Sequence, residues 1–511
     1  MAGPGAPREL GSLVGDRCHR AARDAVLTTG VALDGPGCTP PGPAPRRSRF
    51  SINSSDDTAQ QRLSNQQRYG ISVTENLVSE LDRVVSRATS AHSVWGGSVA
   101  VERSRGLHAA AQALRVESTR LAELIAAETK KTVKEAQGEL ANACNLLDFF
   151  AGTALRPIGD TFPSNRAGVT VYTRRFPLGV VGVITPWNFP ANMAILKVAP
   201  AIAAGNAVVI KPSEFVQQST AAIADVLAPH FPHGLIASVG GSVEVGKALV
   251  AHPEISAVAF TGSTAVGREI AAAAASRGIP ALCEMGGKNC ITVTESAEFA
   301  KSVDAVLTSA FSMNGQKCTA AANVFVSTQV YDAFKETLLA RLPNWADEQR
   351  EMLGEDFIET GLVDQAAWDR VKTVVAQSKG SNALVTYPSD GVIDRNTPVV
   401  LEDVTPQMPV YREEVFGPVI SLIRYESLSD VIAEINSLEY GLVASIYTKD
   451  LPEALSFSES VEAGTVLVNQ PTTGLDFNIP FVGWKASGFG PSEQADDAVK
   501  AYTREKTIYL S

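Results

Sequence analysis

The sequence lacks the residue patterns on which metal sites, disulfide frameworks and membrane spans depend. Its six cysteines are scattered without a CxxC pair, which disfavours a zinc or disulfide framework and is typical of the reducing cytoplasm. The last of its six histidines is His252, so a histidine triad or metal site would have to draw on the first half of the chain. No apolar run reaches the roughly 18 residues that a membrane helix needs. We therefore expect a cytoplasmic protein with no metal and no membrane-spanning segment.

Positive charge is also scarce, since the formal net charge is −11. An acidic surface repels nucleic acid and anionic membranes, so neither is expected as a partner. The hydrophobic content of 45% is that of an ordinary globular protein, and 511 residues exceed what one core accommodates. About two or three domains are therefore expected.

Residues 1–70 differ from the rest of the chain. They contain arginine but no lysine, and residues 35–45 are rich in glycine and proline. Because apolar periodicity is weak here, we expect a largely disordered extension. A targeting peptide and a misassigned start both remain open, and Glu9, Asp16 and Asp24 disfavour the first.

The chain after this extension reads as α/β. Apolar residues recur at helical spacing from residue 73, and Val133–Phe150 predicts a further helix. Strands and helices then alternate, which predicts parallel sheets with ligands bound beyond the carboxyl ends of the strands. In the first series the predicted strands are Val180–Thr185, Ala207–Lys211, Leu235–Val239 and Val258–Thr261, and the predicted helices are Ala191–Ala204, Thr220–Leu227 and Val243–Ala251. In the second series, from Gly287 to Asn469, the strands are Val324–Ser327, Val419–Tyr425, Val443–Tyr447 and Thr465–Val468, and a helix covers Pro452–Val461.

Two further segments predict an assembly element. Arg156–Pro177 reads as a β-hairpin that turns at residues 163–166. The tail Glu505–Leu510 reads as an isolated strand, and an unpaired terminal strand commonly adds to a partner's sheet. A homodimer or homotetramer is therefore expected.

Polar residues gather where the predicted strands end. Asn188, in the run Ile184–Pro190, could direct its amide at an oxyanion or form a local Asx turn. Lys211 and Glu214 could reach ribose hydroxyls or form a solvated surface pair. Phe260–Gly267 passes from strand into helix, as a phosphate cradle does, but it is neither G-x-G-x-x-G nor a P-loop.

Two acidic runs add candidate chemistry. Glu284 emerges from an apolar strand, which raises a carboxyl pKa and suits a general base, although an ion pair with Lys288 is the alternative. Glu414 and Phe416 could hold a ribose and flank a flat ring, or they could lie in an ordinary loop.

One cysteine stands among small residues in Asn314–Ala320. Gly315 permits a tight turn and Lys317 adds positive charge, which suits a reactive Cys318 thiolate; a merely buried thiol is the alternative. A nucleotide cradle, a base, an amide donor and a thiol together indicate covalent oxidation of a carbonyl with a nicotinamide cofactor.

The runs ITPWNFP, KPSE, FTGSTAVG, EMGGKN, GQKC and EEVFGP occur in one order, and the chain from about residue 73 to 510 thereby resembles the aldehyde dehydrogenase superfamily. The resemblance implies an NAD(P)-dependent enzyme that oxidises a small aldehyde. The implied catalytic residues are Cys318, Glu284, Asn188 and Lys211. The implied cofactor-binding residues are Ile184, Trp187, Lys211, Ser213, Glu214, Gly246, Gly262, Ser263, Gly267, Glu284, Glu414 and Phe416.

The resemblance also implies a division into domains. Residues 71–154 and 178–285 form a Rossmann-like cofactor domain, residues 286–468 an α/β catalytic domain, and residues 155–177 with 469–511 an oligomerisation element. Departures from the family pattern are Val482 and Lys130, each where a glycine is common, and Met285 in place of a leucine. The first of these could reshape the substrate mouth.

Several functional alternatives remain at this point. Glu284 favours hydrolysis to a free acid over acyl-CoA formation, and Glu214 favours NAD, with NADP as the alternative. Asn469–Gly474 and Gly490–Gln494 resemble the α-ketoglutarate semialdehyde and vanillin branch, which points to an oxo-acid semialdehyde or an aromatic aldehyde. We take the oxo-acid semialdehyde as the expectation, with an aromatic or a general aliphatic aldehyde as the alternative. A catalytically silent binding relative and a reductase of activated acyl groups are the other classes.

Overall fold

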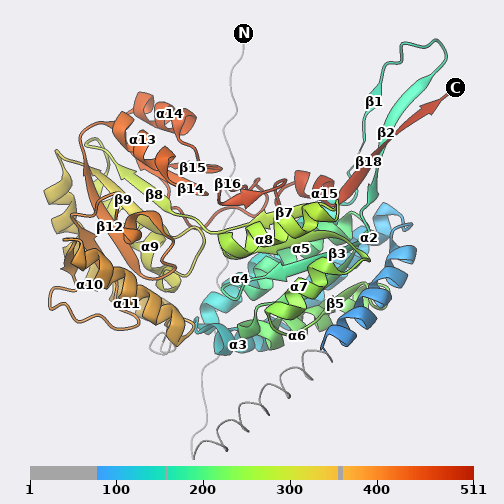
Figure 1. The fold of residues 1–511 in the computed structure, drawn as a ribbon, viewed down its shortest axis with the longest axis horizontal. Coiled ribbons are helices and arrows are strands. Elements are labelled where there is room, and N and C mark those ends of the chain that lie inside the picture. Colours follow the sequence, from blue (N-terminus) through green and yellow to red (C-terminus); the bar gives the residue numbers. More distant parts are fainter. Residues whose placement is uncertain (1–76, 157–158, 355–360) are drawn as a thin grey trace, which may run out of the picture. The chain divides into compact units, whose positions relative to one another are not determined.

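The computed structural model describes residues 77–156, 159–354 and 361–511. The expectation of disorder for residues 1–70 therefore lies outside the described residues. The described chain is α/β, as predicted, with two large sheets, a three-stranded sheet and a two-stranded ribbon (Figure 1). Among the described residues, no helix combines the length and apolarity needed to cross a membrane.

The first large sheet has the strand order β17-β7-β6-β3-β4-β5, with β17 antiparallel and the others parallel. Its parallel strands are fully or largely buried, which is why they read as apolar runs rather than alternating ones. The bounds are β3 Val180–Thr185, β4 Ala207–Pro212, β5 Ile236–Ser238, β6 Ile255–Thr261, β7 Ala281–Glu284 and β17 Gly488–Phe489.

Helices form two layers on this sheet. The helices α5 and α6 pack together with α2, α3 and α4, whereas α7 and α8 pack together as a separate pair (Figure 1). Proline at the first turn starts α5, and a capping box between Thr132 and Glu135 starts α4. The bounds are α2 Ala100–Val116, α3 Ser118–Thr129, α4 Val133–Thr153, α5 Pro190–Ala203, α6 Gln217–Leu227, α7 Val243–Ala251 and α8 Thr264–Ser276, with a further helix over residues 77–95.

The second large sheet has the order β10-β11-β12-β9-β8-β14-β15, parallel except for β10. Its strands alternate between two cores: Phe325 packs with α11, α13 and α14, while its neighbours Val324 and Val326 pack with α9 and α10. The strands are β8 Asn289–Val293, β9 Ala321–Ser327, β10 Leu384–Tyr387, β11 Val399–Glu402, β12 Val419–Tyr425, β14 Val443–Tyr447 and β15 Thr465–Val468. The helices are α9 Phe299–Phe311, α10 Tyr331–Leu353, α11 Gln365–Gly380, α12 Pro409–Arg412, α13 Leu428–Ser437 and α14 Leu451–Ser460.

The predicted hairpin is present, but the prediction of an isolated C-terminal strand is wrong. The tail strand β18 pairs with β2 along its whole length, from Thr503 opposite Pro177 to Leu510 opposite Thr170. The local pattern of a strand carries no information on its partner, which here lies over 300 residues earlier. The bounds of this three-stranded sheet are β1 Thr161–Phe162, β2 Thr170–Pro177 and β18 Thr503–Leu510, and those of the remaining short elements are β13 Tyr440–Gly441, β16 Trp484–Lys485 and α15 Asp497–Ala501.

Lys130, which stands where relatives commonly have glycine, ends α3 in the left-handed conformation, with φ of 63°. The left-handed conformation costs free energy for a residue with a Cβ. Because the Lys130 side chain is exposed, its packing does not offset this cost. We expect Lys130→Gly to stabilise the protein by about 0.5–1 kcal/mol, measured by chemical denaturation. Gln137→Gly, at an exposed position inside α4, should instead destabilise it by about 1 kcal/mol; equal effects of the two substitutions would contradict this interpretation.

Candidate active site

Two cavities meet at Cys318. One, the strand-end cavity, has a volume of about 400 Å³ and lies beyond the carboxyl ends of β3, β4 and β6. The other, the glutamate cavity, has a volume of about 410 Å³ and is lined by Glu284 and Glu493 together with parts of α4 and α5. The residues that line both are Phe189, Met193, Thr261, Met285 and Cys318.

A strained loop presents the thiol at this junction. Met313, Asn314 and Gly315 have φ values of 52°, 54° and 68°, three successive left-handed residues just before the cysteine. After the cysteine, Asn289 Nδ2 donates to the carbonyls of Cys318 and Ala320, both at 2.8 Å. The buried amide of Asn289 thus fixes the thiol-bearing backbone to the start of β8.

Gly315 cannot be replaced without displacing this loop. A Cβ at Gly315 would lie 2.3 Å from the carbonyl oxygen of Gly417. We expect Gly315→Ala to destabilise the protein by at least about 2 kcal/mol and to lower turnover, measured by denaturation and kinetics. Gly278 has the same φ of 68° but nothing within 4 Å, so Gly278→Ala isolates the backbone cost of about 1 kcal/mol; an equal loss in both variants would rule out the steric explanation.

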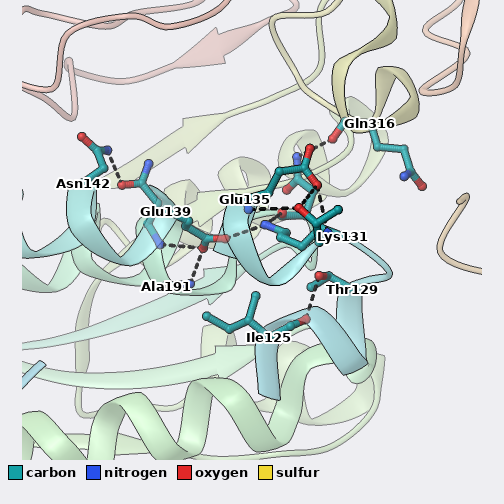
Figure 2. Close-up of polar contacts among 11 residues, drawn as sticks. Ile125, Thr129, Lys131, Glu135, Glu139, Asn142, Ala191 and Gln316 are labelled. Carbon is teal, nitrogen blue, oxygen red and sulfur yellow. Dashed lines mark hydrogen bonds and ion pairs between the residues drawn. The ribbon is translucent and has the colours of Figure 1, made fainter. Parts of the chain in front are cut away.

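Asn188 lies beside the same loop, held by a network that includes residues of α4 and α5. Its Nδ2 donates to Gln316 O at 3.0 Å, which leaves the second amide hydrogen free for a ligand. The backbone carbonyl of Asn188 accepts a hydrogen bond from Lys131 Nζ at 2.7 Å. Lys131 forms a buried ion pair with Glu139, whose other oxygen accepts from the first amides of α5, Ala191 N at 2.7 Å among them (Figure 2). The side chain therefore points to the nucleophile loop, and the alternative of a local Asx turn is wrong.

Burial governs the protonation of the Cys318 thiol and the Glu284 carboxyl. Burial, with the nearby charges of Glu414 and Glu284, raises the pKa of the Cys318 thiol to about 12, so the protein alone holds it protonated. Burial and the charge of Glu493 raise the pKa of Glu284 well above its ordinary value, against opposing contributions from Lys197 and the Gly483 backbone. Glu284 is 6% exposed and its Oε2 has no hydrogen-bond partner among the described residues. Such a carboxylate is a stronger base than an exposed one.

Glu284 does not pair with Lys288, the alternative considered from the sequence. Burial lowers the pKa of Lys288 to about 8, and the carboxylates whose charges oppose this are Glu414 and Glu413 rather than Glu284. A different pair stands behind Glu284: Lys197 and Glu493 form an ion pair in which both side chains are fully buried. A lone lysine within the apolar helix 191–204 was the sequence signal for such a pair.

The strand-end cavity collects most of the predicted cofactor residues. Those that line it are Ile184, Trp187, Lys211, Ser213, Gly262, Ser263, Glu414 and Phe416, and the predicted catalytic residue Asn188 lines it as well. Ser263 precedes α8 without capping it by its side chain, which leaves first-turn amides for an anionic ligand. Trp187 and Phe416 meet edge to face at 5.8 Å, and burial raises the pKa of Glu414 to about 7.

Four predicted cofactor residues are not in its wall, and one of them, Glu284, lines the glutamate cavity instead. Glu214 is exposed in the 3₁₀ turn Glu214–Val216, close enough to Lys211 to raise the lysine pKa that burial lowers. A Cβ at Gly246 would lie 3.9 Å from Lys211 Cδ, in ordinary contact. Gly267 is buried, and a Cβ there would lie 2.5 Å from Met285 Sδ, so this glycine admits the Met285 side chain.

The sequence did not reveal one cation of the strand-end cavity. It also suggested that Val482, a departure from the family pattern, could shape the substrate mouth. Arg370 on α11 lines the strand-end cavity, with its Nε donating to Val415 O at 3.2 Å; no local pattern marks it, because α11 is remote in sequence from the other lining segments. Phe481 rather than Val482 lines the glutamate cavity, so the valine is not part of its wall.

A half-buried thiol between two cavities, a fixed amide and a buried carboxylate are the groups that catalysis through a cysteine nucleophile requires. The strand-end cavity fits a dinucleotide, since it offers uncapped helix amides for phosphate, the buried cation Lys211 and carboxylate and aromatic groups for a nucleoside. Within the described ranges, no group of three or more His, Cys, Asp or Glu side chains could hold a metal ion.

Comparisons with known proteins identify the family to which the chain belongs. The chain belongs to the aldehyde dehydrogenase family, whose model matches residues 53–508. It is 34% identical over 450 residues to alpha-ketoglutaric semialdehyde dehydrogenase of Bacillus subtilis (86% of this chain, 91% of that one) and 33% identical over 439 residues to 2,5-dioxopentanoate dehydrogenase of Saccharolobus solfataricus (84% and 91%). A crystal structure of betaine aldehyde dehydrogenase from Staphylococcus aureus in complex with NAD+ superposes with a TM-score of 0.78 at 27% identity, over 84% of this chain and 87% of that one. The protein is thus an NAD(P)-dependent oxidoreductase that acts on an aldehyde.

Proposed function

We propose that this enzyme oxidises a short oxo-acid semialdehyde to the free acid through a thioester on Cys318. One observation carries the mechanism: Cys318 lines both cavities, whereas Glu284 lines only the glutamate cavity. The aldehyde therefore enters from the side of the base, and the cofactor from the side of the strand ends. The two relatives reported above act, by their names, on semialdehyde or dioxo-acid substrates, which supports the substrate class.

In this mechanism the thiol of Cys318 loses its proton to solvent water, and the sulfur attacks the aldehyde carbon to give a thiohemiacetal. The free amide hydrogen of Asn188 stabilises the oxyanion. When bound, the nicotinamide supplies the hydride acceptor that converts the thiohemiacetal to a thioester. Glu284 then deprotonates a water, which attacks the thioester carbon and releases the carboxylic acid and the free thiol. Lys211 is proposed to assist from the strand-end cavity, where it holds the cofactor.

The proposed cofactor residues are those expected from the sequence, with Glu214, Gly246, Gly267 and Glu284 acting from outside the wall of the strand-end cavity. Glu214 is exposed just beyond Lys211, where its carboxylate can accept from ribose hydroxyls and repel a 2′-phosphate. We therefore propose a preference for NAD over NADP.

The domain division, assembly and location are proposed as expected from the sequence. The parallel sheets fall within residues 178–285 and 286–468, and residues 498–502 of the tail pack into the core of the first sheet. On the three-stranded sheet Arg174 lies directly opposite Lys506, a like-charge pair that an acidic partner surface would relieve, and Tyr509 and Leu510 are exposed. These features support a homodimer or homotetramer, and the scattered free cysteines support a cytoplasmic location.

A panel of aldehydes assayed with NAD and with NADP tests the function. The absorbance of reduced nicotinamide should rise with succinic semialdehyde, with higher kcat/KM for NAD, and the product should be the free acid. Product that appears only as acyl-CoA would refute hydrolysis, and a panel without turnover would support a silent binding relative. Faster turnover of an aromatic or alkyl aldehyde would change the proposed substrate class but leave the proposed reaction unchanged.

A further inference from the structure

The glutamate cavity has a mostly apolar wall that also contains four charged residues. Its apolar wall includes Leu146, Leu196, Phe477 and Phe481, and its charged lining residues are Glu139, Glu284, Lys317 and Glu493. Glu139 is neutralised by Lys131, and Glu493 by Lys197. Among the described residues that line the cavity, Lys317 is therefore the one cation.

Lys317 has no bonded counter-ion in the described chain. Burial lowers the pKa of Lys317 to about 8, the charge of Lys131 adds to this, and the charge of Glu135 opposes it without forming an ion pair. A desolvated ammonium is costly unless a charge or several acceptors compensate it. Because the Lys317 ammonium has no ion-pair partner in the described chain, we expect its counter-charge to come from a ligand bound in the cavity.

Two amide side chains line the same cavity as Lys317. Asn142 Nδ2 donates to Asn192 Oδ1 at 2.6 Å, and both residues line the cavity. No described residue accepts a bond from Asn192 Nδ2, so its hydrogens remain available to an acceptor. An ammonium and amide donors in one cavity suit a carboxylate, which has about four acceptor sites.

The position in the chain limits the length of the ligand. Lys317 directly precedes Cys318, and adjacent Cα atoms are about 3.8 Å apart. Because both side chains line the same cavity, one short ligand can contact Lys317 and Cys318 together. The carboxylate of Glu284, which has no paired cation among the described residues, would repel the anion of that ligand.

We propose that Lys317 binds the carboxylate of the substrate and selects oxo acids of about four or five carbons over neutral aldehydes. This specificity role rests on the proposed aldehyde oxidation and names the residue that sets its substrate class. The Asn142–Asn192 pair assists by donating to the same carboxylate.

The test compares succinic semialdehyde with butanal, which share a four-carbon chain but differ in charge. Lys317→Met should lower the ratio of their kcat/KM values by on the order of 10- to 100-fold, mainly through KM for the semialdehyde. Lys317→Arg should keep most of the ratio, because it keeps the charge. Lys130→Met removes the same charge from an exposed position outside this cavity and should not change the ratio.

A second readout does not depend on turnover. Succinate should protect Cys318 of the wild-type enzyme from iodoacetamide, and this protection should be lost in Lys317→Met. An unchanged ratio in Lys317→Met, a wild-type preference for butanal, or absence of succinate protection would each overturn the proposal while leaving aldehyde oxidation intact. Failure of the wild type on every aldehyde would instead overturn the proposed function.

Discussion

Replacing Cys318 with alanine should lower kcat for aldehyde oxidation by at least about 10⁴-fold. The reason is that no other thiol of the described chain lines either cavity: the other free cysteines there, Cys144, Cys283 and Cys290, are buried. Cofactor binding should persist, since the strand-end cavity keeps its other residues. Initial rates of nicotinamide reduction measure the loss, and fluorescence titration with the cofactor measures binding.

Cys144→Ala is the matched control for this substitution. Cys144 is buried in α4, and burial raises its pKa to about 11, which keeps it an inert thiol. Its loss should leave kcat near the wild-type value. Turnover retained by Cys318→Ala, or lost equally in Cys144→Ala, would remove Cys318 from the mechanism.

Glu284→Gln should lower steady-state turnover by about 10²- to 10⁴-fold. Formation of the thioester should be slowed much less than its hydrolysis. The glutamine keeps the size of the side chain but cannot deprotonate the water that attacks the thioester. A rapid burst of reduced nicotinamide should therefore precede a slow steady state. Glu413→Gln, which removes an exposed carboxylate, should behave as the wild type.

The pH profile gives an independent check on the same residue. The base acts only when deprotonated, so kcat should rise with pH through the pKa of Glu284 and then level off. Because burial and the charge of Glu493 raise that pKa, the acidic limb should lie above the ordinary glutamate range. The limb should disappear in Glu284→Gln; a limb that survives would assign it to another group.

Local sequence patterns predicted most of the secondary structure. The bounds of β3, α7, β12, β14 and β15 are those expected, because buried parallel strands and capped helices carry their signal within a few residues. The partner of β18 could not be predicted in this way, since pairing depends on a strand far away in the chain.

The same limit applies to the site. The motif residues could be singled out because glycine, carboxylate and thiol chemistry is visible at strand ends. The groups that hold them could not: Lys131 contacts Asn188 across 57 residues, and Lys197 pairs with Glu493 across 296. Gln316 and Asn289 lay inside the matched runs, yet their roles in fixing the Asn188 amide and the thiol loop appear only in three dimensions.

Mass spectrometry of Glu284→Gln, quenched during the burst with succinic semialdehyde and NAD, tests the central claim most directly. The account predicts one added acyl group, carried as a thioester on the peptide that contains Cys318. An unmodified Cys318 after a full burst, or an adduct on another residue, would contradict covalent oxidation at this thiol.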